Sequence, residues 1–164
     1  MILVLNLTIQ TYQFDLVNYT IMDNHFHFYI KTRTGGESIS RIMQFIKSQY
    51  ARRYNRLMHR TGPFWNERFK DTIIEFTREP VLYFFYILMY IAFNPVRSRT
   101  VTDPRNYPYS GINCYWDQDY VSPVPITLHA YFLKLGNTFK ERVQKLLEYE
   151  DMYRKRIVHD YLFE

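Results

Sequence analysis

FDLVNYTIMDNHFHFYIK, residues 14–31, contains two short runs in which apolar side chains alternate with polar ones. Alternation of this kind predicts β-strands, because successive side chains of a strand point to opposite faces. Between the two runs stands Asp23-Asn24, a pair that favours a tight turn. The stretch therefore predicts an antiparallel hairpin whose strands are residues 14–22 and residues 25–31.

The segments on either side of this hairpin predict helices and a third strand. Residues 2–13 are apolar on more than one face and are expected to be the end of a helix. Ser38 is a suitable N-cap for a long helix that extends to about residue 60. After a Gly-Pro break, RFKDTIIEF at residues 68–76 is expected to form a third strand.

A second long helix is predicted to begin at Pro80, because proline is tolerated in the first turn of a helix. It should end near Asn94, because the residue before Pro95 is pushed out of the α-helical region. Residues 96–125 are rich in Tyr, Pro and Asp and predict a loop, and residues 126–164 predict one or two charged amphipathic helices.

The predicted order is helix-strand-strand-helix-strand-helix. A ferredoxin-like, or RRM-like, fold has the order strand-helix-strand-strand-helix-strand, so the chain fits this fold if the first strand is missing. We therefore expect an α+β fold with an antiparallel sheet, helices on one face of the sheet, and additional C-terminal helices. The expected boundaries are a domain over residues 1–116 and a helical C-terminal extension over residues 117–164.

Basic residues are concentrated in one part of the chain. The whole protein has 21 Lys and Arg against 16 Asp and Glu. Residues 41–70, called the basic window here, hold one acid, Glu67, and eight basic residues: Arg41, Lys47, Arg52, Arg53, Arg56, Arg60, Arg68 and Lys70. Such a window is typical of a surface that binds a polyanion. On charge alone, a solvated helix face explains it equally well.

The composition argues against a disulfide scaffold and against a membrane protein. Cys114 is the only cysteine, so no disulfide can form within the chain, as suits a reducing cytosol. The apolar N-terminal segment lacks the features of a signal peptide. The apolar run at residues 81–93 has 13 residues, fewer than the roughly 20 that span a bilayer. We expect a cytoplasmic protein with no membrane partner.

Two histidines and a tyrosine–asparagine pair are candidates for chemistry. His25 and His27 are two residues apart on a predicted strand, so both point to one face, with Cα atoms roughly 6.5 Å apart. Two ordinary histidines on an open sheet face are the more common explanation of this motif. Tyr90 and Asn94 are four residues apart and project from one helical face. Tyr90 also belongs to a tyrosine stripe with Tyr83 and Tyr86, which is typical of core packing.

Four segments together resemble the HUH single-tyrosine transposases, and they occur in the family's order over roughly residues 12–115. The segment YIAFNPVR resembles the family's Y-I-x-x-N-P-V-[KR] motif, and the DPRNYPYS segment resembles a stretch that follows it in REP-associated tyrosine transposases. The four segments are DNHFH at 23–27, GPFWNERFKD at 62–71, YIAFNPVR at 90–97 and DPRNYPYS at 103–110.

This resemblance implies a transposase that cleaves hairpin-associated single-stranded DNA through a 5′-phosphotyrosine intermediate. Tyr90 is then the nucleophile, and His25, His27 and Asn94 hold Mg²⁺ or Mn²⁺. We expect a monomer whose partner is single-stranded or hairpin DNA. The expected DNA-binding residues are Arg52, Arg53, Arg56, Arg60, Trp65, Arg68, Lys70 and Arg97.

Three other functions remain open at this point. The first is a DNA-binding module of the same family that has lost cleavage. The second is an RRM-like RNA binder, although the sequence has no K/R-G-F/Y-G/A-F-V-x-F/Y segment. The third is a rolling-circle replication initiator, which would use the same chemistry, but the YIAFNPVR segment favours the transposase instead.

The resemblance also gives an expectation about the N-terminus. In the family, a strand and most of a helix precede the segment that matches residues 2–13. We expect the chain to lack both, and therefore to be weakly active or inactive. The alternative is that residues 1–11 form a replacement strand.

Overall fold

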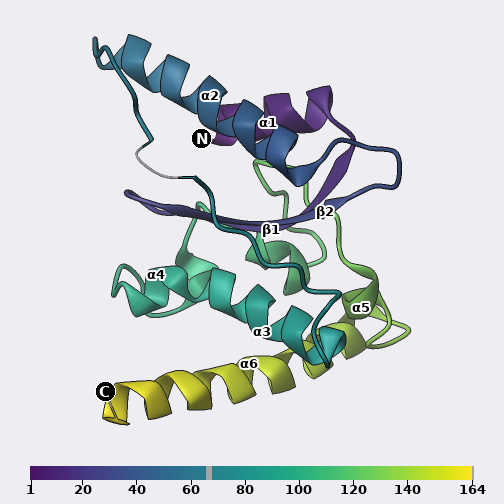
Figure 1. Ribbon diagram of the computed structural model, residues 1–164. Coiled ribbons are helices and arrows are strands. Elements are labelled where there is room, and N and C mark those ends of the chain that lie inside the picture. Colours follow the sequence, from purple (N-terminus) through teal and green to yellow (C-terminus); the bar gives the residue numbers. More distant parts are fainter. Residues whose placement is uncertain (66–67, 164) are drawn as a thin grey trace.

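The computed structural model describes the backbone of residues 1–65 and 68–163 and the side chains of residues 1–65 and 68–157. Asn66 and Glu67, which belong to the basic window and to the GPFWNERFKD segment, lie outside the described residues. A two-stranded antiparallel sheet lies between two layers of helices, as Figure 1 shows. The α+β class expected from the sequence is confirmed.

The hairpin forms where the alternating pattern predicts it. Strand β1 spans Phe14–Ile21 and strand β2 spans Phe26–Thr32, and the two pair antiparallel. The Met22 amide donates to the His25 carbonyl at 2.8 Å, which closes the turn at Asp23-Asn24. The register shifts between Leu16 and Asn18, where one extra residue of β1 is accommodated as a bulge.

Helices α1 (Ile2–Thr11) and α2 (Ile39–Leu57) form the layer above the sheet in Figure 1. The expected helix over residues 2–13 is confirmed, and the alternative of a replacement strand over residues 1–11 is wrong, because these residues are helical. Ser38 caps α2 by accepting a hydrogen bond from the Arg41 amide at 3.3 Å. The core of this layer, called the upper core here, joins the two helices to the sheet through Leu5, Leu16, Tyr19, Ile42, Met43 and Ile46.

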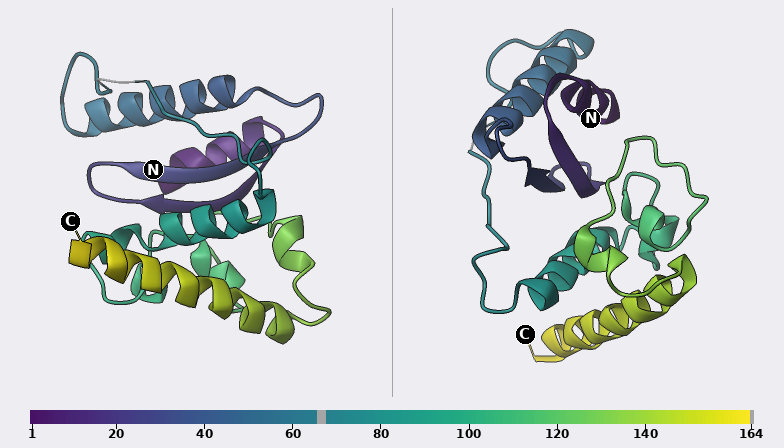
Figure 2. Two further views of the ribbon diagram at one scale, coloured as in Figure 1. Left: turned by 60° about the horizontal axis from the view of Figure 1, so that its bottom comes forward. Right: turned by 90° about the vertical axis from the view of Figure 1, so that its right-hand side faces the viewer.

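A second layer covers the opposite face of the sheet. It contains α3 (Pro80–Ala92), α4 (Asn94–Arg97), α5 (Ala130–Leu133) and α6 (Phe139–Phe163), and both views of Figure 2 show α6 running beside α3. No helix in the described part of the chain is long and apolar enough to cross a bilayer. The core of this layer, called the lower core here, includes Val17, Tyr29, Phe84, Leu88, Phe132, Leu146 and Tyr153.

The segment between α4 and α5 contains two short 3-10 helices, Pro104–Asn106 and Ile112–Tyr115. The chain between them follows the outer edge of β1. The Ile21 amide donates to the Tyr109 carbonyl at 2.9 Å, and the Gly111 amide donates to the Tyr19 carbonyl at 3.0 Å. This long segment, which the sequence predicts as a loop, therefore covers one edge of the hairpin.

The third strand predicted at residues 68–76 is wrong. In the described part of the chain the sheet has two strands, and residues 68–76 cross from the α1–α2 layer to the α3 layer as an irregular segment. A strand requires a neighbouring backbone that supplies its hydrogen bonds. Two of its apolar side chains are used in packing instead, because Phe69 contacts the upper core and Ile74 is buried in the lower core, whereas Ile73 and Phe76 are exposed.

The expectation of helices on one face of the sheet is also wrong. Strand β1 is buried on both faces, with Leu16 and Tyr19 in the upper core and Val17 in the lower core. A sheet that is apolar on both faces needs helices on both. The described residues consequently leave no open sheet face of the kind on which an RRM stacks RNA bases, and the ferredoxin-like topology stays a prediction.

Truncation of Leu88 tests the lower core. Leu88 on α3 is fully buried, so Leu88→Ala leaves a cavity and should lower the free energy of unfolding by about 2–5 kcal/mol. The matched control is Leu82→Ala on the same helix, where the side chain is 42% exposed and the loss should stay below about 1 kcal/mol. Urea unfolding followed by circular dichroism measures both variants. Equal losses would contradict the placement of Leu88 in the core.

Candidate functional site

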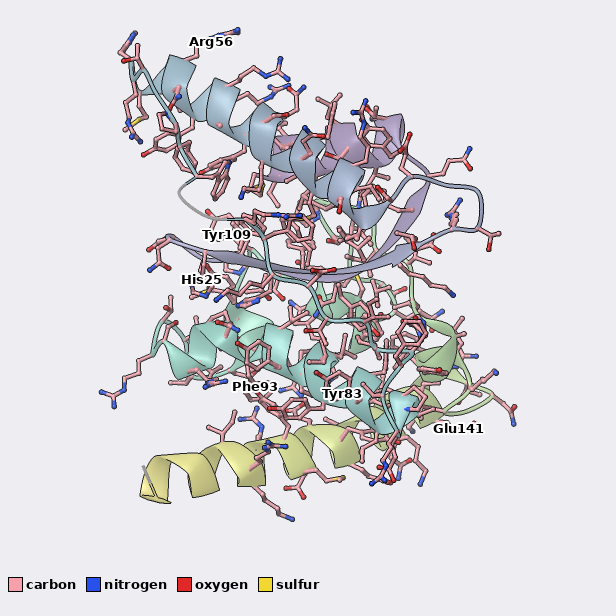
Figure 3. All side chains as sticks on the ribbon, viewed as in Figure 1. His25, Arg56, Tyr83, Phe93, Tyr109 and Glu141 are labelled. Carbon is pink, nitrogen blue, oxygen red and sulfur yellow. The ribbon has the colours of Figure 1, made fainter. Side chains whose placement is uncertain are left out.

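The start of β2 and the junction between α3 and α4 meet at one end of the sheet. His25 immediately precedes β2, and His27 is the second residue of that strand. Tyr90 lies in the last turn of α3, and Asn94 is the first residue of α4. Figure 3 shows His25 between the turn end of the hairpin and the layer that contains α4. The fold therefore brings together the four residues that the sequence proposes for chemistry.

The alternation of β2 directs the histidine face towards α3. Tyr29 shares this face with His27, and its ring centroid lies 5.3 Å from that of Phe84 on α3. Phe26 and Phe28 point to the other face, where their rings stack with centroids 4.5 Å apart in the upper core. The packing of the apolar positions of β2 consequently sets the direction in which His27 points.

The end of α3 places Tyr90 and Asn94 one turn apart on the same face, as their spacing predicts. The Phe93 amide donates to the Met89 carbonyl at 2.8 Å, so the helical path continues to the start of α4. The Asn94 side-chain Nδ2 donates to the Tyr90 carbonyl at 3.3 Å. This bond orients the amide so that Asn94 Oδ1 points towards the histidines.

A chain of contacts links the four side chains. The ring centroids of His25 and His27 are 5.2 Å apart, and those of His27 and Tyr90 are 5.4 Å apart. His25 Nε2 lies 3.0 Å from Asn94 Oδ1, and Asn94 also lies near His27, whose pKa it raises. Two imidazoles and one amide oxygen thus converge beside a tyrosine ring.

His25 is held between two amide oxygens, and this arrangement suits a cation. Its Nδ1 lies 2.6 Å from Asn24 Oδ1, and its Nε2 faces Asn94 Oδ1. A neutral imidazole carries one N–H and can donate to only one of these oxygens. The other contact then joins two lone pairs, unless the ring is protonated or a cation binds both atoms.

The separation of these two atoms is consistent with a six-coordinate ion. Two ligand atoms that are each about 2.1 Å from an octahedral ion, and at right angles to one another, lie about 3.0 Å apart. Nitrogen and oxygen donors in such a set suit Mg²⁺ or Mn²⁺ better than a closed zinc site. Among the described residues no group of three or more His, Cys, Asp and Glu is placed to hold a metal. The candidate set therefore consists of the two imidazoles of His25 and His27 and the side-chain amide oxygen of Asn94.

The surroundings of His27 favour its neutral form. Burial, and then the nearby His25 and Arg97, lower the pKa of His27, whereas the neighbouring Asn94 acts in the opposite direction. A metal binds the neutral imidazole, so a lowered pKa keeps His27 available as a ligand at lower pH. Asn24 acts on His25 in a different way: if Asn24 Oδ1 accepts a proton held on His25 Nδ1, then Nε2 is the nitrogen left free to bind a metal.

Tyr90 and Tyr86 lie one turn apart on α3 but have different neighbours. Tyr90 is half-buried, contacts His27, and has the Arg97 guanidinium carbon 5.4 Å from its ring centroid. Tyr86 packs against α6, with its ring centroid 5.5 Å from that of Tyr153. Of the two tyrosines, Tyr90 is the one beside the histidines.

The basic residues expected to bind DNA form a second feature on the same side of the molecule. The exposed side chains of α2 and its following turn include Arg52, Arg53, Arg56 and Arg60. In Figure 1 and in the left view of Figure 2, this end of α2 and the turn of the hairpin lie on the same side. The remaining expected cations, Arg68, Lys70 and Arg97, are also exposed.

Trp65 is partly enclosed by aromatic side chains. Its Nε1 donates to the Lys47 carbonyl at 2.8 Å, and its ring contacts Tyr50 and Phe64 at centroid distances of 5.6 and 4.6 Å. The Lys47 ammonium lies 5.3 Å from the ring centroid. Only the part of Trp65 that these neighbours leave uncovered could stack on an unpaired base.

Two residues at this site were not identified from the sequence. Asn24 appears there as part of a turn and of the DNHFH segment, with no role of its own, although its place next to His25 could have suggested the contact. Tyr153 lies on α6 beside Arg97, which lowers the pKa of its hydroxyl against the larger effect of burial. No local pattern connects Tyr153 with the YIAFNPVR segment, so only the packing of α6 on α3 reveals it.

A family model described as "Transposase IS200 like" matches residues 3–82, just under half of the 164-residue chain. The matched region contains His25 and His27 and ends before Tyr90 and Asn94. No curated protein and no solved structure matches the chain. The match supports the transposase family for this chain, and the REP-associated branch stays a prediction.

Metal binding tests the histidine pair. We expect protein in phosphate-free buffer to bind Mn²⁺ at one site, and His25→Ala/His27→Ala to weaken that binding by at least about tenfold. Titration calorimetry measures the affinity. His59→Ala is the control, because His59 is exposed and lies just beyond the end of α2. Unchanged Mn²⁺ binding by the double variant would mean that these histidines are not the ligands.

Proposed function

We propose that this chain is a transposase that cleaves and rejoins single-stranded DNA, with Tyr90 as the nucleophile. The observation that carries this proposal is the contact of Tyr90 with His27 in a site that also contains His25 and Asn94. The match to the IS200-like transposase model supports the same function class. REP-associated tyrosine transposases are the branch that we propose, on the YIAFNPVR and DPRNYPYS segments.

The proposed reaction exchanges one phosphate ester bond for another. The Tyr90 oxygen bonds to the phosphorus of the scissile phosphodiester, and the bond between phosphorus and the 3′ oxygen breaks. The phenol proton passes to solvent, and the leaving 3′ oxygen takes up a proton. The products are a 5′-phosphotyrosine and a free 3′-hydroxyl. Attack by another 3′-hydroxyl reverses the step and joins two strands without ATP.

The residues around Tyr90 have distinct proposed roles. A tyrosine with the ordinary pKa of about 10 is a weak nucleophile at neutral pH. A divalent cation such as Mg²⁺ or Mn²⁺ bound by His25, His27 and Asn94 would polarise the scissile phosphate and offset the charge that develops in the transition state. Arg97 places a guanidinium beside the Tyr90 ring, where it would attract the phosphate.

The proposed substrate is single-stranded DNA that folds back into a hairpin. The exposed arginines of α2 would neutralise its phosphates, and the aromatic side chains around Trp65 would contact unpaired bases. The runner-up function is a DNA-binding module without cleavage, which would use the same basic surface. Formation of a covalent adduct separates the two functions.

Removal of one hydroxyl tests the nucleophile. Tyr90→Phe should abolish the covalent protein–DNA adduct on a denaturing gel while DNA affinity changes by less than about threefold, because the substitution removes no charge. Tyr86→Phe is the matched control from the same helix and should form the adduct normally. An adduct that survives Tyr90→Phe but not Tyr86→Phe would reassign the nucleophile. Binding by the wild type with no adduct at all would favour the binding module.

The salt dependence of binding tests the DNA surface. Fluorescence anisotropy with a labelled hairpin oligonucleotide gives the slope of log affinity against log salt. Replacing Arg52, Arg53 and Arg56 with Ala should reduce the magnitude of this slope by about 2, because each phosphate contact on a single strand contributes about 0.7.

The control for this measurement removes the same charge elsewhere. A triple variant to Ala at three exposed lysines of α6 and the loop before it should leave the slope nearly unchanged: Lys134, Lys140 and Lys145. If both triple variants change the slope equally, the DNA surface is not at the end of α2.

A further inference from the structure

The C-terminal helix α6 reaches the candidate site from behind α3. Tyr153 of α6 is only 4% exposed. Its ring centroid lies 5.5 Å from that of Tyr86 and 5.4 Å from that of Phe93. These two residues flank Tyr90 along α3 and its C-terminal end. Tyr153 is therefore buried against the helical turn that presents the proposed nucleophile.

Arg97 connects Tyr153 with Tyr90. Its guanidinium lies close enough to the Tyr153 hydroxyl to lower the pKa of that group, and the guanidinium carbon lies 5.4 Å from the Tyr90 ring centroid. Arg97 is otherwise an exposed residue at the end of the four-residue helix α4. A long arginine side chain at such a position samples several rotamers, and a buried hydroxyl partner limits that freedom.

A charged network holds this part of α6 in place. Glu150 is 4% exposed and pairs with Arg105 at 2.6 Å and with Arg154 at 2.7 Å. Asp103 completes the network by pairing with Arg105 at 2.9 Å. Because Asp103 and Arg105 follow α4 closely in the chain, the network joins α6 to the segment that comes directly after α4. The network therefore holds α6, and with it Tyr153, against the segment that follows Arg97 in the chain.

The hydroxyl of Tyr153 is unnecessary for packing alone. Phenylalanine would fill the same space, and a buried hydroxyl is costly without a partner. Burial raises the pKa of Tyr153 to about 12, while Arg97 acts in the opposite direction. Tyr153 therefore stays protonated at neutral pH, so its hydroxyl can hold a guanidinium and is a poor nucleophile itself.

We propose that Tyr153 is a positioning residue that holds the Arg97 guanidinium beside Tyr90, so that cation and nucleophile face the scissile phosphate together. The inference rests on the proposed function for the assignment of Tyr90 as the nucleophile. It gives the C-terminal helix a part in DNA cleavage that is distinct from packing. Tyr153 acts through Arg97 and does not itself touch the DNA.

The test is a double-mutant cycle on the full chain, with a labelled hairpin oligonucleotide and Mn²⁺. Tyr153→Phe should lower the single-turnover rate of adduct formation by roughly ten- to a hundredfold, as expected for a misplaced catalytic group. The dissociation constant for DNA should change much less. In an Arg97→Ala background, the same Tyr153→Phe substitution should have no further effect on the rate, because the residue acts through Arg97.

Tyr149→Phe is the matched control. Tyr149 lies one turn earlier on α6 and stacks on Phe85 with ring centroids 4.0 Å apart. This variant loses a hydroxyl from the same helix away from Arg97 and should cleave at the wild-type rate. Equal melting temperatures for the wild type and both tyrosine variants will show that a change in rate is not a change in folding.

A readout that needs no catalysis is the NMR signal of the Arg97 side-chain Nε–H group. Tyr153→Phe should shift this signal and speed its exchange with water, whereas Tyr149→Phe should leave it unchanged. If the wild type cleaves and Tyr153→Phe cleaves equally fast, or if the two substitutions have independent effects, the positioning role is wrong and the proposed function stands. If the wild type forms no adduct, both are wrong, whatever the NMR signal shows.

Discussion

The packing of α3 against the hairpin determines where the candidate catalytic groups lie. The rings of Tyr29 on β2 and Phe84 on α3 have centroids 5.3 Å apart, and Phe84 is fully buried. Because the helical path continues from α3 into α4, the packing of α3 also places Asn94 at the end of the sheet where His25 lies. The separation of 3.0 Å between His25 Nε2 and Asn94 Oδ1 follows from that packing. A tilt of α3 would separate the two halves of the site even if every side chain were kept.

Much of the fold and the main site residues could be predicted from the sequence, because their signals are local. The hairpin follows from alternation and one turn, and the spacing of His25 from His27 and of Tyr90 from Asn94 sets their faces. The strand expected at residues 68–76 failed because strand formation depends on a partner backbone, which a local pattern does not reveal. The proposed role of Tyr153 was not visible for a similar reason, since it depends on how α6 packs on α3.

The two layers of helices have different proposed roles. The upper layer presents the arginines of α2, which suit the nonspecific attraction of a polyanion. The lower layer presents Tyr90, Asn94 and Arg97, which are the groups proposed to act on one phosphate. The hairpin lies between the layers and contributes the histidines at its turn end. DNA bound along this side of the molecule would therefore contact both layers.

Mapping of the covalent adduct tests the central claim most directly. The wild-type protein is incubated with a hairpin oligonucleotide and Mn²⁺, digested with nuclease and trypsin, and sequenced by tandem mass spectrometry. The tryptic peptide covering residues 79–97 contains Tyr83, Tyr86 and Tyr90, and its fragment ions distinguish them. The account predicts a 5′-linked nucleotide on Tyr90. A nucleotide on Tyr83 or Tyr86, or on a different peptide, would contradict it.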